Sequence, residues 1–336
     1  MKNEINLLDL SNYLGNIHVK INQAFLKSLM MKASENKKPH LDREFMKKLK
    51  MKPQTRYGGS MTIYGWTQYD KTIPLNKLSK IVELAKHHWQ KVESKITYLK
   101  AGQHGGEISP KFPIKLNREL GSITGHILGD GSIDLKYNQV FYSNSNKELL
   151  KEFESCMYKI FGIKPRIWMQ RTSTFEGKTR WEKRLNNIDE LKDGRNCGLF
   201  YPTICGLVLN HALDNFAVGI NKKITRTILK TNVEFKRGLI KAFYDDEGTV
   251  DKHSGYIRLF QDRKEILEKF SRLLKEFGIS TSPIKAYIRR DKERYYFNIH
   301  RKSNFIKFQK EIGFTSKKKS ERLKQLTIIK NYKNSR

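Results

Sequence analysis

The sequence predicts an α+β protein in which two pseudo-symmetric halves follow a small, mainly helical N-terminal domain. Two observations carry this prediction. A block of nine residues occurs twice, at Ile123–Gly131 and Ile240–Gly248, and each copy ends in an acidic residue followed by glycine. The residues before Leu116 contain no copy of this block. We therefore divide the chain into an N-terminal module (1–100), a linker (101–115), a first half (116–230) and a second half (231–336).

The register between the two copies continues beyond the block at a spacing of 117 residues. The β-like run Val140–Tyr142 corresponds to Ile257–Leu259, and the helical run Lys147–Leu150 corresponds to Lys264–Leu267. A shared order of helix, acid-glycine end, strand and second helix indicates a duplicated domain. Two related halves can bring their two acids together.

Small residues in both blocks favour close contact between the helices that the blocks form. Gly125 and Gly129 lie four residues apart on one helical face, and Ala242 continues the pattern in the second copy. Helices that cross there would bring Asp130 and Glu247 together at their C-terminal ends, where like charges and the negative helix ends repel. A divalent cation offsets this repulsion, and oxygen ligands favour Mg²⁺. The alternative is that each acid only ends a buried helix at a turn.

The two blocks resemble the LAGLIDADG motif of homing endonucleases, and the resemblance covers both halves. It implies two αββαββα halves. It also implies that the eighth motif position, here Asp130 and Glu247, is the metal-binding acid, with the main-chain carbonyls of Gly129 and Asp246 as further ligands. The copies depart from the motif at position four of the first, which is His126, and at position seven of the second, where Asp246 replaces a small residue.

Two further pairs of residues complete the predicted catalytic set. Asn144 and Gln261 follow equivalent strands, and the resemblance implies that a polar residue there orders water near the scissile phosphate; local hydrogen bonding near a helix N-cap is the alternative. The resemblance also implies a lysine in the basic segments that close the halves, for which we select Lys223 and Lys317. An ammonium there would stabilise a pentavalent phosphate, whereas a lysine run that contacts only solvent or phosphates is the alternative.

Alternating apolar and polar residues predict strands with one face on the core and one face outward. Tyr256–Gln261 is an example, and the run from Tyr295 to Arg301 continues the style. The outward residues are of types that contact base edges in a major groove, although a solvated sheet face has a similar composition. The predicted DNA-binding residues are Arg166, Trp168, Gln170, Arg171, Arg180, Arg184, Arg258, Arg289, Asn298 and Arg301.

The composition indicates the class of partner. Lys and Arg total 66 against 34 Asp and Glu, which gives a formal net charge of +32. Such an excess favours nucleic acid, with a membrane surface as the weaker option. No apolar stretch is long enough for a transmembrane helix, and no signal-peptide pattern is present. The three cysteines are too few for a disulfide framework. We expect a soluble protein of the cytoplasm with access to genomic DNA. The terminal residues also lack the nucleophile and His-Asn pair of an intein, so we expect a free-standing protein.

The N-terminal module has its own helical pattern. Apolar spacing predicts one helix within 74–85 and another at 41–49. Their order faintly resembles a phage-repressor helix-turn-helix, with residues 63–69 near the recognition helix and Gly58 and Gly59 in the turn. A small helical cap on the nuclease is the alternative. Glycines and prolines after residue 101 predict the linker.

These observations predict a monomeric, site-specific DNA endonuclease that makes a double-strand break at a long asymmetric target. Mg²⁺ is the expected cofactor, with Mn²⁺ able to substitute. Double-stranded DNA is the expected partner, and no membrane is expected. Two alternatives stay open: a non-cleaving DNA-binding transcription regulator of the same fold, and a maturase that binds structured intron RNA.

Overall fold

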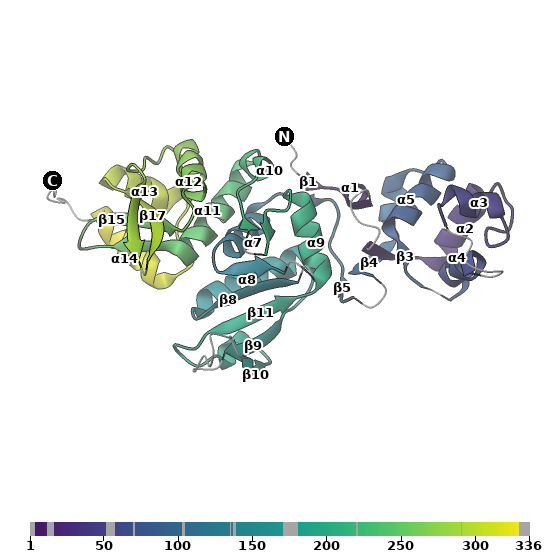
Figure 1. Cartoon of the computed structure of the whole chain (residues 1–336), viewed down its shortest axis with the longest axis horizontal. Coiled ribbons are helices and arrows are strands. Elements are labelled where there is room, and N and C mark those ends of the chain that lie inside the picture. The colour runs from purple at the N-terminus through teal and green to yellow at the C-terminus, as the bar shows by residue number, and fades with distance from the viewer. Residues whose placement is uncertain are drawn as a thin grey trace. The chain divides into compact units, whose positions relative to one another are not determined.

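The computed structural model describes residues 4–11, 17–51, 58–69, 71–102, 105–134, 136, 139–170, 181–219, 221–289 and 291–328. The chain forms two compact units, one from residues 115–201 and 212–336 and the other from residues 4–114 and 202–211. Figure 1 labels their elements. Among the described residues, no helix is both long and apolar enough to cross a membrane.

Both repeats lie in the first unit except for residues 202–211, and each begins with a long helix. The elements of the first repeat are α7 (Arg118–Leu128), β7 (Gly131–Ile133), β8 (Val140–Asn144), α8 (Lys147–Phe161), β9 (Arg166–Gln170), β10 (Trp181–Leu185), η1 (Ile188–Glu190), β11 (Cys197–Tyr201), α9 (Thr203–Ala212), β12 (Ala217–Val218), β13 (Asn221–Lys222) and α10 (Arg226–Leu229). Its sheet has the order β10-β9-β11-β8-β7-β12-β13. Only the pairing of β7 with β12 is parallel among these described strands.

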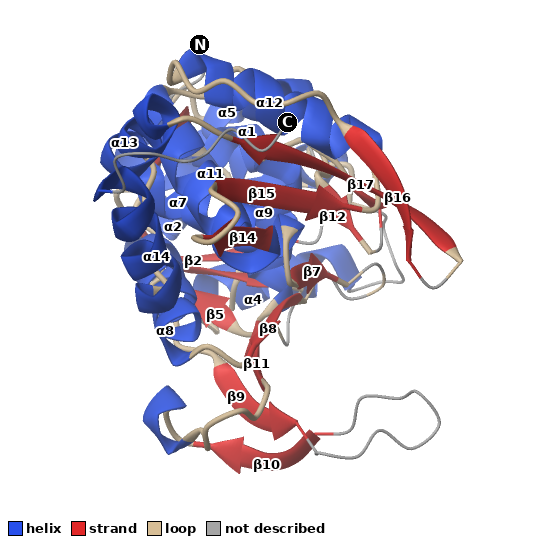
Figure 2. Cartoon of the chain, turned by 90° about the vertical axis from the view of Figure 1, so that its left-hand side faces the viewer, coloured by secondary structure: helices blue, strands red, loops and turns tan. Residues whose placement is uncertain are grey.

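The second repeat has the simpler αββαββα order, followed by one further helix, α14. Its elements are α11 (Val233–Glu247), β14 (Gly248–Asp251), β15 (Tyr256–Gln261), α12 (Lys264–Glu276), β16 (Lys285–Arg289), β17 (Lys292–Ile299), α13 (Lys302–Glu311) and α14 (Lys317–Ile328). The strands form an antiparallel sheet of order β14-β15-β17-β16, shown in Figure 2. The α+β fold of two pseudo-symmetric halves is therefore confirmed, and β10, β12 and β13 are additions in the first half.

The apolar patterns explain how the helices cover the sheets. On α12 the buried residues are Ile266, Leu267, Phe270, Leu273 and Leu274, at the three- and four-residue spacing of one helical face. Helix α12 packs on β15 and β17, and helix α11 packs on β15. Among the described elements, the opposite face of the four-stranded sheet stays open. That open face is where Arg258 and Asn298 lie, paired across β15 and β17.

Residues 4–114 of the N-terminal unit combine six helices with short strands. Its described elements are β1 (Glu4–Ile5), α1 (Leu7–Ser11), β2 (Ile17–Ile21), α2 (Gln23–Ala33), α3 (Arg43–Lys48), α4 (Gly58–Gln68), β3 (Ile73–Pro74), α5 (Leu75–Leu84), α6 (Trp89–Glu93), β4 (Ile96–Ala101), β5 (Glu107–Ile108) and β6 (Ile114–Lys115). Helices predominate, as predicted, and the expected helix after Pro74 is α5. The antiparallel sheet β3-β2-β4-β5 was not predicted.

Two details of this unit, the place of Gly58 and Gly59 and the presence of a strand in the predicted linker, differ from the sequence-based prediction. Gly58 and Gly59 lie in the first turn of α4 and not in the turn before it. Ile63 and Trp66, in the segment expected near a recognition helix, are 0% and 6% exposed and pack into the core of the unit, and the helix-turn-helix stays a prediction. Strand β5 lies within the predicted linker, where its backbone completes the sheet beside β4.

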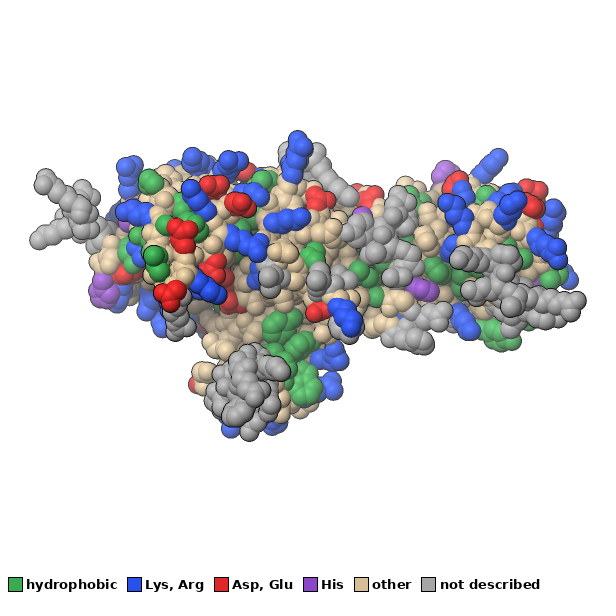
Figure 3. Space-filling view, in the orientation of Figure 1, with side chains coloured by type: hydrophobic (Ala, Val, Ile, Leu, Met, Phe, Trp, Pro, Cys, Tyr) green, Lys and Arg blue, Asp and Glu red, His purple; other side chains and the backbone are tan. Residues whose placement is uncertain are grey.

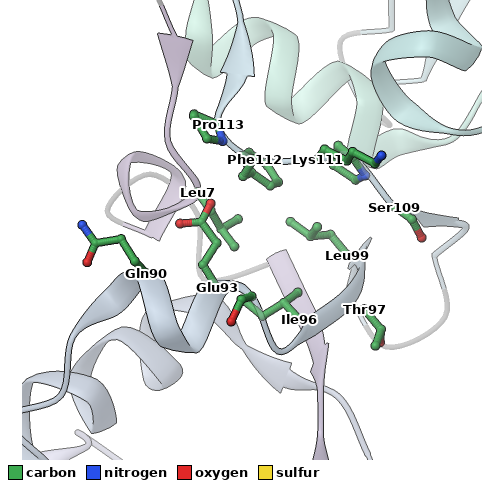
Figure 4. Close-up of a pocket in the computed structure, with 12 residues that line it drawn as sticks. Leu7, Gln90, Glu93, Ile96, Thr97, Leu99, Ser109, Lys111, Phe112 and Pro113 are labelled. Atoms are coloured by element: carbon green, nitrogen blue, oxygen red, sulfur yellow. The ribbon is translucent and has the colours of Figure 1, made fainter.

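A pocket of about 540 Å³ lies within the N-terminal unit (Figure 4). Leu7, Leu99 and Phe112 are among its apolar lining residues, and Glu93 and Lys111 are the charged ones. One acid and one base do not make the strongly positive lining that a DNA groove requires. We therefore place the candidate chemistry elsewhere, where the two repeats meet.

Candidate active site

Helices α7 and α11 pack backbone against backbone. A methyl group added at Gly121 would lie 2.0 Å from the carbonyl oxygen of Phe235, and one at Gly125 would lie 2.5 Å from that of Leu239 and 2.8 Å from the Cβ of Ala242. No side chain fits at these distances, so glycine is required. The close approach predicted from Gly125 and Ala242 is confirmed. Gly121 extends the glycine spacing by one turn and was missed.

The two motif acids lie at the C-terminal ends of these helices. Asp130 follows Gly129, the C-cap of α7, and Glu247 is the last residue of α11. Burial by surrounding protein raises the pKa of Asp130 to about 6, with a further rise from the charge of Asp246. Burial also raises the pKa of Glu247 to about 7, and the charge of Asp130 adds to this. The carboxylates therefore repel one another when both are ionised, as the sequence argument expected.

Two lysines approach the same helix ends from opposite halves. Lys222 Nζ donates to the carbonyl oxygen of Gly129, and Lys319 Nζ donates to the carbonyl oxygens of Tyr244 (3.0 Å) and Asp245. Ammonium groups are favourable there because a helix C-terminus is negative. Burial lowers the pKa of both lysines, and the surrounding carboxylates oppose that change.

The lysines selected from the sequence, Lys223 and Lys317, are not the ones that lie at the ends of α7 and α11. Lys223 is exposed and its backbone N–H donates to Phe216 O at 2.8 Å, because alternation along β13 turns Lys222 inward instead. The Lys317 side chain is 84% exposed and lies 3.6 Å from Glu148. Since α14 begins at Lys317, it is Lys319 that turns toward α11. The carbonyl of Gly129, expected to bind metal, accepts the Lys222 ammonium.

The two departures from the motif contact each other. The imidazole of His126 and the carboxylate of Asp246 are both 0% exposed, and Nδ1 lies 3.0 Å from Oδ2. Asp246 also accepts a hydrogen bond from the Tyr142 hydroxyl at 2.8 Å and one from the Asp130 backbone N–H at 3.4 Å. An expected main-chain ligand therefore contributes a buried carboxylate directly beside Asp130.

A second carboxylate completes the surroundings of His126. Glu152 Oε2 lies 3.7 Å from His126 Nε2, and Glu152 Oε1 lies 3.3 Å from Lys241 Nζ. Burial alone would lower the pKa of His126, but Asp246 and Glu152 outweigh it and raise that pKa. Although burial opposes it, the pKa of Glu152 lies well below its usual range because of His126 and Lys241. The imidazolium form thus balances the Asp246 charge.

Asn144 and Gln261 do not have equivalent surroundings. Asn144 Nδ2 donates to Asp130 Oδ2 at 2.9 Å, so this amide contacts the predicted metal ligand directly. Gln261 Oε1 accepts from the backbone N–H of Asp262 at 2.9 Å, which is the local hydrogen bond of the alternative interpretation. The site is therefore asymmetric, with an amide held on the Asp130 side.

The sequence also matches a known family in both repeats. The model of the LAGLIDADG-like domain matches residues 118–193 and 234–313. The two repeats of the chain belong to the LAGLIDADG family. Its resemblance to that motif, with acids at both eighth positions, is thus confirmed.

Two curated relatives each match about 65% of this chain. DNA-directed RNA polymerase subunit Rpo1C of Methanocaldococcus jannaschii is 34% identical over 220 residues, which are 65% of this chain and 22% of that protein. The replication factor C small subunit of the same organism is 28% identical over 220 residues, 64% of this chain and 10% of the relative. The chain thus spans at most about a fifth of the length of these two proteins.

Two solved structures resemble this chain, each with a low TM-score. The homing endonuclease I-DmoI in complex with DNA and Mn has 20% identity and a TM-score of 0.39, covering 59% of this chain and 97% of that one. Full-length DUF199/WhiA from Thermatoga maritima has 12% identity and a TM-score of 0.39, covering 66% of this chain and 63% of that one.

The predicted DNA-binding residues of the LAGLIDADG halves lie mostly on the outward sides of strands. Arg166, Arg184 and Arg289 are exposed, whereas Trp168, Gln170, Arg258 and Asn298 are half-buried on β9, β15 and β17. Arg171 and Arg180 lie outside the described residues. Arg301 was misplaced, because β17 ends at Ile299 and Arg301 is the N-cap of α13 with φ 74°.

Clusters of aromatic rings on these faces were not predicted. In the first half, the Trp181 ring centroid lies 5.6 Å from that of Phe141 and 5.2 Å from that of Phe200. In the second half, Tyr287 and Tyr296 lie 5.7 Å apart. Lys and Arg side chains, by contrast, are dispersed among acidic ones over the face in Figure 3. The sequence did contain a signal for these clusters, because aromatic residues occur in the strands that have an alternating pattern.

Glu247→Gln is expected to stabilise the metal-free LAGLIDADG protein at neutral pH. Because the folded-state pKa of Glu247 is raised to about 7, the folded state binds more protons than the unfolded state between the two pKa values. Wild-type stability therefore falls as pH rises through this window. The variant should be more stable by about 1–2 kcal/mol at pH 8 in EDTA and equal near pH 4.

Thermal unfolding in EDTA across this pH range measures the effect. Asp130→Asn should show a smaller gain, because Asp130 is more exposed than Glu247 and solvent screens its charge more strongly. Added Mg²⁺ should stabilise the wild type but not the variant. A variant less stable than the wild type in EDTA at pH 8 would contradict the assigned repulsion.

Proposed function

We propose that the protein is a site-specific DNA endonuclease that makes a metal-dependent double-strand break. The observation that carries this proposal is the convergence of Asp130 and Glu247, with raised pKa values, beside the ammonium groups of Lys222 and Lys319. Mutually repelling acids at two helix ends are costly to hold together, and their retention at a structural turn alone has no physical benefit.

The donor set fits a hard divalent cation such as Mg²⁺, for which Mn²⁺ can substitute. No group of three or more His, Cys, Asp or Glu suited to a metal is present among the described residues. Two carboxylates nevertheless suffice for Mg²⁺, which keeps several waters and binds substrate phosphates. Asp130 and Glu247 would hold it. When bound, the cation would lower the pKa of a water and stabilise charge on the phosphate oxygens.

The remaining residues orient and stabilise the reacting groups. Asn144 donates to Asp130 and fixes the direction of that carboxylate. Asp246 accepts from the Asp130 backbone and, balanced by His126, keeps the end of α7 in place. Lys222 and Lys319 would place positive charge beside the scissile phosphates as they become pentavalent. Each half thus supplies one acid and one ammonium, which suits the cleavage of two strands by one chain.

Double-stranded DNA is the proposed partner of a monomer, because a single chain carries both motif helices. The N-terminal module would add DNA contacts of its own and lengthen the target. This function requires a cellular location with access to genomic DNA. The non-cleaving regulator is the nearest competitor, and retention of both acids argues against it.

Cleavage of DNA spanning the intronless allele of the host gene tests the proposal. The full chain should linearise a plasmid that carries this DNA in the presence of Mg²⁺ or Mn²⁺, and it should leave the plasmid intact in EDTA. Tight binding without cleavage under every divalent metal tested would instead support the regulator.

Lys222→Met and Lys319→Met are each expected to slow cleavage by about 100-fold while changing DNA affinity by less than about tenfold. Each change removes a positive charge beside the reacting phosphate and leaves dispersed DNA contacts in place. Lys223→Met and Lys317→Met are the matched controls, because these two lysines lie close in sequence to Lys222 and Lys319 but are themselves exposed to solvent. Single-turnover cleavage and equilibrium binding should be measured for all four. Equal losses in the control pair would remove the assignment.

A further inference from the structure

The guanidinium of Arg258 is held in place by three neighbouring side chains. Its Cζ lies 4.2 Å from the ring centroid of Tyr256 and 4.3 Å from that of Tyr296. Its Nε donates to Oδ1 of Asn298 at 2.7 Å, and Asn298 is its partner across β15 and β17. Two phenol rings and one amide therefore fix the plane of the guanidinium on the open face of the sheet.

The two terminal nitrogens of this guanidinium remain available. Within the described part of the chain, neither Nη1 nor Nη2 of Arg258 donates a hydrogen bond or joins an ion pair. A planar pair of donors with a fixed direction matches an edge that has two acceptors side by side. In the major groove, guanine presents such an edge through O6 and N7. A mobile arginine loses conformational entropy when it binds a ligand. For Arg258 most of this entropy is already lost in the free protein, because the two rings and Asn298 hold the side chain in place.

The equivalent position of the first half has different chemistry. Phe141 occupies the repeat position of Arg258, and its ring centroid lies 4.9 Å from that of Phe200 across β8 and β11. Trp181 covers Gly198 next to them, since a methyl group at Gly198 would lie 2.5 Å from the Trp181 ring. These rings have no donor fork. Any guanine requirement set by Arg258 should therefore have no mirror image in the other half of the target.

We infer that Arg258 reads one guanine in the major groove on the side of the target bound by the second half, and that Tyr256, Tyr296 and Asn298 are its positioning residues. This inference rests on the DNA recognition in the proposed function, and not on cleavage. A phosphate would also accept the fork. A phosphate contact carries no base preference, so the two ligands can be separated by experiment.

Selection of bound duplexes from a library with a randomised centre tests the inference with the full chain in Ca²⁺, where cleavage is not needed. The wild type should enrich guanine at one position by about tenfold over the other bases. Arg258→Lys keeps the charge but lacks the fork, so enrichment there should fall below about twofold while other positions are unchanged. Asn298→Ala should weaken the same position, and Asn298→Asp, which keeps an acceptor, should retain it.

Arg272→Lys on the helix side of the sheet is the matched control and should leave the selected sequence unchanged. The inference is overturned if Arg258→Lys selects the wild-type sequence, if Arg258→Ala weakens all sequences equally, or if the wild type enriches no guanine. Failure of the nuclease would be visible separately, as selection of a defined sequence with no cleavage in Mg²⁺.

Discussion

Asp130→Asn and Glu247→Gln are each expected to abolish double-strand cleavage in Mg²⁺, by at least about 10³-fold, while DNA affinity changes by less than about tenfold. The metal requires these carboxylates, whereas binding energy comes from phosphate and base contacts spread over both sheets. Plasmid cleavage and equilibrium binding measure the two quantities independently.

Residual nicking adds a sharper criterion. If each acid serves one strand, any remaining nick should lie in one strand for Asp130→Asn and in the other for Glu247→Gln. Asp189→Asn is a suitable control because that carboxylate is 72% exposed and pairs only with Lys151 among the ion pairs of the described residues. Full double-strand cleavage by either active-site variant would exclude the assigned site.

The parts predicted correctly from the sequence are those fixed by residue identity at a single position. Glycine at 125 has few alternatives, because the backbone of α11 lies against it, and the acid before Gly131 lies at the end of the same helix because of its place in the sequence. The duplication supplied the second helix and the second acid. Lysine runs lack this property, since neighbours of identical chemistry in a run differ only in the direction that β13 or α14 gives them.

Other features depend on contacts that no local pattern records. Strands of two residues, such as β3 and β5, are too short to show alternation. Residues 202–211 group with the N-terminal unit although they lie within the first repeat. His126 and Asp246 were noticed separately as departures from the motif, and only the pairing of α7 with α11 brings these residues together.

That pairing leads to the second large effect. His126→Leu is expected to destabilise the protein by about 3–5 kcal/mol, because it leaves the buried Asp246 carboxylate without its cation. Asp246→Ala should also be destabilising, since His126 and Tyr142 lose their acceptor. The double variant restores an apolar and a small residue at the two motif positions. It should therefore lose much less than the sum of the single changes, with a coupling energy of about 2–3 kcal/mol.

Unfolding by urea of the four proteins measures this coupling, and additive losses would show that the two departures do not compensate each other. Cleavage by the double variant then separates stability from chemistry. Asp246 accepts hydrogen bonds from the Asp130 backbone and from the Tyr142 hydroxyl, and the Asn144 amide donates to the carboxylates of Asp130 and Asp246. A double variant that is stable yet cleaves slowly would mean that the buried pair orients Asp130. Full activity would mean that the pair serves only the packing of the two helices.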